Sequence, residues 1–145
     1  MPFLRQPTAT GWNILFLAWL LAFASTLGSL FFSDVMNFAP CILCWYQRIF
    51  LFPLVFIFTT GLIVYDRSVV RYALPLTVAG LLVAIYQNLM IFGIVPDSIQ
   101  PCSQGVSCTE KYIELFGFLS IPLLSLLAFT TILVLLLILN RRFKR

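Results

Sequence analysis

Four cysteines are the residues of this sequence that are best suited to chemistry. Cys41 and Cys44 stand in the stretch APCILCWYQRIF, and Cys102 and Cys108 stand in PCSQGVSC. A Cys-x-x-Cys pair can be a redox centre, half of a metal site or a structural disulfide. Two intervening residues let the sulfurs close a small ring that can be opened and formed again. Arg48 follows Cys44 by four residues, so on a helix it would share that face about 6 Å further along.

The first pair is expected at the start of a helix, because Pro40 ends the segment before it. Free N–H groups and the positive end of the helix dipole would favour a thiolate there. Trp45 and Tyr46 belong to the aromatic belt at a membrane surface. Arg48 on its own is open to two interpretations: an anchor whose long stem reaches back to the interface, or a fixed charge that stabilises a thiolate or a reduced cofactor.

The second pair, Cys102 and Cys108, is separated by five residues and a flexible Gln-Gly turn. Ser107 and Glu110 have the spacing of a capping box, which predicts a short helix from Cys108 onward. Apolar and charged residues then alternate at helical spacing, so this helix is expected to lie flat on the membrane surface. The spacing permits either a permanent disulfide that closes the loop or a working redox pair.

Four long apolar segments must position these cysteines. The chain is 61% hydrophobic and 10% charged, whereas soluble domains carry about 25% charged residues. The segments cover residues 12–32, 45–65, 72–95 and 116–140, and each exceeds the ~20 residues that a membrane-spanning helix needs. The first is too long for the apolar core of a cleaved signal peptide. We predict an all-α membrane protein: one integral membrane domain over residues 1–145, with a four-transmembrane-helix bundle and cysteine-bearing loops at 33–44 and 96–115.

The distribution of positive charge predicts the orientation of this bundle. Seven of the nine Lys and Arg residues lie before the first segment, between the second and third, or after the fourth: Arg5, Arg67, Arg71, Arg141, Arg142, Lys144 and Arg145. The positive-inside rule makes these parts cytoplasmic, together with both termini. All four cysteines then face the oxidising side, where an even number favours disulfides. The net charge of +4 therefore reflects the topology of the chain and does not indicate nucleic-acid binding. The basic residues at the C-terminus are expected to contact lipid headgroups.

Two other classes of function use the same cysteines. Four thiolates could bind a metal ion, but the second spacing is wider than zinc sites prefer, and the sequence has no histidine. We therefore expect no metal. The bundle could also be a structural or transport protein with two inert disulfides.

The chain resembles the disulfide bond formation protein B family (DsbB), especially its short BdbC-like branch. The motifs CILCWYQRIFLFPL from Cys41, PCSQGVSC and GFLSIPLLSLLAF carry the resemblance. It implies a thiol:quinone oxidoreductase of the bacterial cytoplasmic (inner) membrane. Such an enzyme reoxidises an extracytoplasmic thioredoxin-fold thiol oxidase (DsbA- or BdbD-like) and passes two electrons to ubiquinone or menaquinone.

The resemblance also implies roles for individual residues. Cys102 would form the mixed disulfide with the partner, and Cys108 would then engage Cys41. Cys44 would give the thiolate that reacts with the quinone, which Arg48 would hold.

The sequence departs from this family pattern in two places. The second cysteine pair is closer than in members with a longer loop. Relatives often carry a histidine in the outer half of the third helix, where this chain has Gln87 and Asn88. Gln87 is therefore a candidate cofactor-binding residue, with ordinary interhelical hydrogen bonding as the alternative. A vitamin K epoxide reductase-like enzyme is the second candidate, although the Cys-x-x-Cys at the start of the second helix argues against it.

Overall fold

The structure is a computed structural model, which describes residues 8–37, 40–96, 99 and 121–144 of the chain. The helices are α1 (Ala9–Leu30), which continues into a π-helical turn η1 (Phe31–Val35), then α2 (Ile42–Val64), α3 (Ser68–Ile91) and α4 (Ile121–Lys144). All four helices are long and apolar enough to cross a membrane. The prediction of an all-α membrane protein with four spanning helices is confirmed.

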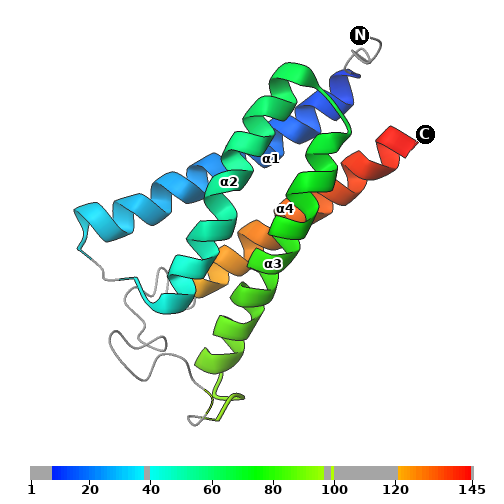
Figure 1. Ribbon diagram of the computed structural model, residues 1–145. Coiled ribbons are helices and arrows are strands. Elements are labelled where there is room, and N and C mark those ends of the chain that lie inside the picture. The colour runs from blue at the N-terminus through cyan, green and yellow to red at the C-terminus, as the bar shows by residue number, and fades with distance from the viewer. Residues whose placement is uncertain (1–7, 38–39, 97–98, 100–120, 145) are drawn as a thin grey trace.

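The four helices form a bundle in which each helix packs against two others. Neighbours in the chain pack together, and α1 closes the ring by packing against α4 (Figure 1). The start of α1, the turn between α2 and α3, and the end of α4 lie at one end of the bundle. The start of α2 therefore lies at the opposite end, together with the end of α3.

Buried apolar side chains from all four helices form the core. The largest of them include Leu15, Leu54, Phe58, Phe129, Ile132 and Leu136. Gly80 of α3 faces the ring of Phe129 in α4, and a Cβ at that position would collide with the ring. The missing side chain thus allows a close approach of α3 and α4, as small residues do at membrane helix interfaces.

The helix boundaries differ from the limits of the apolar segments. The third segment was expected over 72–95, but α3 runs from Ser68 to Ile91. It begins earlier because charged side chains at the surface do not interrupt backbone hydrogen bonding. It ends earlier because Gly93 adopts a left-handed φ of 71°, a common way for helices to stop. Likewise α2 begins at Ile42 rather than at residue 45, and α4 continues to Lys144 rather than stopping at residue 140.

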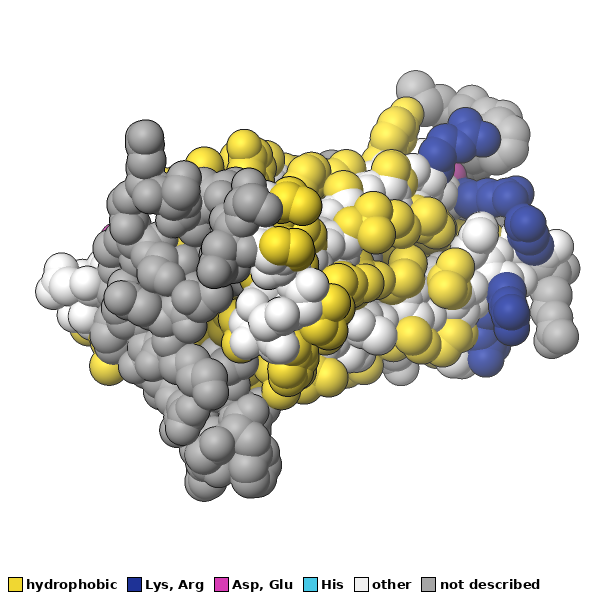
Figure 2. All heavy atoms as spheres, turned by 90° about the horizontal axis from the view of Figure 1, so that it is seen from below, with side chains coloured by type: hydrophobic (Ala, Val, Ile, Leu, Met, Phe, Trp, Pro, Cys, Tyr) yellow, Lys and Arg dark blue, Asp and Glu magenta, His cyan; other side chains and the backbone are white. Residues whose placement is uncertain are grey.

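Basic side chains gather at the end of the bundle that holds the α2–α3 turn and the end of α4. They are Arg67, Arg71, Arg141, Arg142 and Lys144. Figure 2 shows these blue side chains at one end, with apolar side chains along the surface of the helices. Since Cys41 precedes α2 at the other end, the length of the bundle separates the first cysteine pair from these charges. The surface helix predicted after Cys108 lies outside the described residues.

Candidate redox-active site

The first cysteine pair lies at the start of α2. Cys41 occupies the N-cap position with an extended backbone, and its carbonyl accepts the first helical hydrogen bond, from the amide of Trp45. Cys44 lies in the first turn, three residues later and on the same side. Both thiols are free, and the sulfurs lie 3.1 Å apart. The pair therefore needs only a small side-chain adjustment to reach the bond length of about 2.05 Å of a disulfide.

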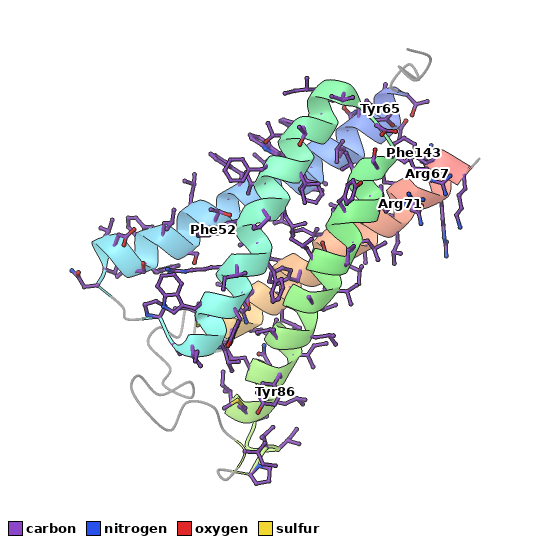
Figure 3. The ribbon with its side chains drawn as sticks, in the orientation of Figure 1. Phe52, Tyr65, Arg67, Arg71, Tyr86 and Phe143 are labelled. Carbon is purple, nitrogen blue, oxygen red and sulfur yellow. The ribbon has the colours of Figure 1, made fainter. Side chains whose placement is uncertain are left out.

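A small apolar cluster shields this pair. Leu43 and Met90 are buried beside Cys41, and Tyr86 of α3 packs against the same cluster. Figure 3 shows Tyr86 near the end of α3, on the side of the bundle where α2 begins. Cys41 is 7% exposed, whereas Cys44 is more accessible. The hydrogen bond with the Cys44 sulfur, together with burial, raises the pKa of the Cys41 thiol above its usual range. The raised pKa favours the protonated form of the Cys41 thiol.

Gln87 of α3 lies directly beside the two sulfurs. Its side-chain nitrogen Nε2 is 3.5 Å from the sulfur of Cys41 and 3.5 Å from that of Cys44. Its oxygen accepts a 2.7 Å hydrogen bond from Nε2 of Gln47 in α2. Gln87 thus makes the interhelical bond that was the alternative to cofactor binding, and it also contacts both cysteines. Neighbouring Asn88 turns to α4 instead, where it donates to the Pro122 carbonyl at 3.0 Å.

Arg48 lies one turn deeper in α2 and is fixed to α1. Its Nε donates to the Ser29 hydroxyl at 2.8 Å, and its Nη2 donates to the Ser29 carbonyl at 2.7 Å. The guanidinium carbon also lies 5.5 Å from the centre of the Trp45 ring, within the range of a cation–π interaction. The Arg48 side chain is 9% exposed. A buried cation is therefore held beside the cysteine pair by contacts with two helices.

Two residues of this site, Gln47 and Ser29, were missed by the sequence analysis. Each is a polar residue inside an otherwise apolar helix, and such residues usually face a partner within the protein. That signal singles out both positions, although it does not identify the partner.

The structure brings Cys41, Cys44 and Gln87 into contact and places Arg48 nearby. Cys102 and Cys108 lie outside the described residues, so their predicted roles stay predictions. No group of three potential metal ligands occurs within residues 8–37, 40–96, 99 and 121–144. A metal site of four thiolates would therefore need both cysteines of the second pair.

Known proteins are similar to this sequence over most of its length. The family described as "Disulfide bond formation protein DsbB" matches residues 11–139. The "Probable disulfide formation protein" of Metapseudomonas resinovorans is 47% identical over 138 residues, which cover 94% of this chain and 96% of the relative. "Disulfide bond formation protein C" of Bacillus subtilis (strain 168) is 41% identical over 122 residues, which cover 83% of this chain and 87% of the relative.

A third relative, the "Probable disulfide formation protein" of Deinococcus radiodurans, is 46% identical over 132 residues, which cover 84% of this chain and 85% of the relative. No solved structure matches the chain. The matches cover most of this chain and most of each relative. The chain belongs to the DsbB family of disulfide bond formation proteins, and as a multi-pass membrane protein of this family it has an oxidoreductase role in generating disulfide bonds.

Proposed function

We propose that this protein is a membrane thiol:quinone oxidoreductase that reoxidises a thioredoxin-fold thiol oxidase outside the cytoplasm. The observation that carries the proposal is the arrangement at the start of α2. Two sulfurs 3.1 Å apart lie where a spanning helix begins, and a buried arginine lies one turn deeper. A lipid-soluble electron acceptor can approach a site at the start of a spanning helix from within the membrane.

The proposed electron path uses both cysteine pairs. Two thiols of the partner become a disulfide as the Cys102–Cys108 disulfide becomes two thiols. Those thiols are oxidised again as the Cys41–Cys44 disulfide is reduced. Cys41 and Cys44 then return to the disulfide and release two electrons and two protons. A membrane quinone, either ubiquinone or menaquinone, accepts these two electrons and two protons and becomes a quinol. Cys102 is proposed as the residue that forms the mixed disulfide with the partner.

The donor groups of Arg48 fit a quinone oxygen. Ser29 occupies Nε and Nη2 of the guanidinium, while Nη1 has no hydrogen-bond partner among the described residues. A planar guanidinium that is fixed by two bonds can present its third nitrogen to an acceptor with little loss of side-chain entropy. Its charge would favour electron density on a carbonyl oxygen. The two bonds to α1 support a positioned charge more than a mobile surface anchor.

The proposed orientation places the basic end of the bundle in the cytoplasm of a bacterium and the cysteines outside its cytoplasmic membrane. The segregation of Lys and Arg supports this orientation through the positive-inside rule. Single-cysteine variants in intact cells test it with an impermeant thiol reagent. We expect labelling at position 102 or 108 without lysis. Labelling only after lysis would show that these positions face the cytoplasm, which is the opposite orientation.

Anaerobic mixing of the purified protein with a quinone and a reduced thioredoxin-fold oxidase tests the activity. We expect one quinol for each partner disulfide formed, and none with the Cys44→Ser variant. Oxidation of the partner without quinol would show that the electrons go elsewhere. If none of the tested quinones and partners reacted, the proposal would be overturned in favour of a protein with inert disulfides.

A further inference from the structure

Two buried glutamines connect the cysteine pair to the interface between α2 and α3. Gln47 follows Cys44 in the first turns of α2, and Gln87 lies forty residues later in α3. Both side chains are buried, and they meet through the 2.7 Å hydrogen bond from Gln47 to Gln87. Beyond this bond, the Gln87 nitrogen lies 3.5 Å from both sulfurs. The mechanism proposed above uses neither side chain.

The bond from Gln47 determines which end of the Gln87 amide faces the cysteines. An amide has an accepting oxygen at one end and two N–H donors at the other. Because Gln47 donates to the oxygen, the two N–H groups of Gln87 point toward the two sulfurs. The reversed amide would place its oxygen against any negative charge on a sulfur. Gln47 thus acts through Gln87 and does not touch the reacting atoms.

We infer that the Gln87 amide stabilises the reduced form of the Cys41–Cys44 pair, and that Gln47 is a positioning residue that fixes the orientation of this amide. Disulfide sulfurs accept hydrogen bonds weakly, whereas a thiolate accepts a charge-assisted hydrogen bond. The amide therefore stabilises the pair more after it has gained two electrons, which raises the reduction potential of the pair. This inference rests on the proposed function, because it assigns the amide to a pair that is reduced and reoxidised in each cycle.

The reduction potential of the pair tests this inference without any quinone or partner. In a Cys102→Ser, Cys108→Ser background, quinone-free protein is equilibrated with mixtures of reduced and oxidised glutathione. Two glutathione thiols become glutathione disulfide as the Cys41–Cys44 disulfide becomes two thiols, and alkylation followed by mass spectrometry counts the thiols. We expect Gln87→Met to lower the equilibrium constant for reduction about tenfold, which makes the potential about 30 mV more negative.

Three further variants separate positioning from packing. Gln47→Met leaves the Gln87 amide free to turn, so we expect a shift of the same sign but only about threefold. Gln47→Glu replaces the donor by an acceptor of equal size and turns the amide around, so the shift should be at least that of Gln47→Met. Asn88→Leu is the matched control, because it removes a buried amide of α3 that bonds to Ala84 and Pro122 instead of sulfur. It should lower thermal stability and leave the potential unchanged.

Equal potentials in wild type and Gln87→Met would overturn the inference, as would a shift of equal size in Asn88→Leu. If Gln87→Met does not fold, the two Gln47 variants decide, and unchanged potentials in both would also overturn it. Failure of the proposed function gives a different result, since wild-type protein would then reduce no quinone whatever potential its cysteine pair has.

Discussion

The guanidinium of Arg48 holds both the hydroxyl and the carbonyl oxygen of Ser29, at 2.8 Å and 2.7 Å. These bonds join α2 to α1 across nineteen positions of sequence. They orient the guanidinium plane, and a surface anchor has no need of such an orientation. The contact leads to two linked predictions, one for each residue.

Replacing Arg48 is expected to impair the reaction with quinone. Lysine keeps the charge but offers a compact, strongly hydrated ammonium that cannot bond Ser29 and a quinone with a planar fork. Loss of one charge-assisted hydrogen bond lowers affinity or rate by roughly 10- to 100-fold. Arg48→Lys and Arg48→Gln should therefore raise the quinone KM or slow quinol formation, as measured in steady state over a range of quinone concentrations.

Trapping of the partner mixed disulfide is the control for this experiment. The proposed electron path assigns that step to Cys102 and Cys108, so it should proceed normally in both Arg48 variants. Unchanged quinone kinetics in Arg48→Gln at normal protein levels would mean that the arginine serves as an anchor.

Replacing Ser29 is expected to have a smaller effect of the same kind. Ser29→Ala removes the hydroxyl and leaves the carbonyl, so Arg48 keeps one of its two bonds. A hydrogen bond to a charged group contributes about 1.5–3 kcal/mol, and one of the two bonds remains, so we expect a rise of roughly 3- to 10-fold in the quinone KM. Ser25→Ala, on the same helix, is the matched control. Wild-type kinetics in the Ser29→Ala variant would show that the Ser29 hydroxyl does not position Arg48.

The two cysteines of the first pair are expected to differ in reactivity. The raised pKa of Cys41 keeps this thiol protonated, and thiolates are the nucleophiles. In reduced Cys102→Ser, Cys108→Ser protein at neutral pH, iodoacetamide should modify Cys44 at least about tenfold faster than Cys41. Peptide mapping measures both rates, and unfolding in detergent should make them similar. Faster reaction at Cys41 in the folded protein would reverse the assignment.

The second pair is expected to be a working redox pair and not a permanent staple. Cys102→Ser should remain folded and inserted in the membrane, because the contacts among the four helices lie outside this loop. It should lose partner oxidation completely, since the Cys102–Cys108 disulfide that is proposed to receive the first electrons cannot form. Partner disulfides are counted by alkylation after a timed reaction. Full activity in the Cys102→Ser, Cys108→Ser double variant would contradict the relay.

The helices of this protein follow from its sequence more directly than the contacts of its site do. A membrane requires long apolar segments, so composition alone predicts four spanning helices. Pro40 and the aromatic residues after it place the first cysteine pair at the start of α2. Helix ends were less predictable, because the left-handed conformation of Gly93 and the helical turn before Tyr72 depend on backbone geometry rather than on hydropathy.

The partners of the polar side chains could not be read from the sequence. Gln47 and Gln87 meet because α2 and α3 pack side by side in one particular register, and a rotation of either helix would separate them. Ser29 likewise becomes a partner of Arg48 only because the end of α1 lies beside the start of α2. The sequence marked Gln87 as a site residue, but packing determines that its amide points to the sulfurs.

A single turnover tests whether the first cysteine pair transfers its electrons to quinone. The Cys102→Ser, Cys108→Ser variant is fully reduced, freed of reductant and mixed anaerobically with excess quinone, with no partner present. We expect one quinol per protein together with a Cys41–Cys44 disulfide, and no quinol from the same protein carrying Cys44→Ser. Thiols that remain reduced beside unreacted quinone would contradict it.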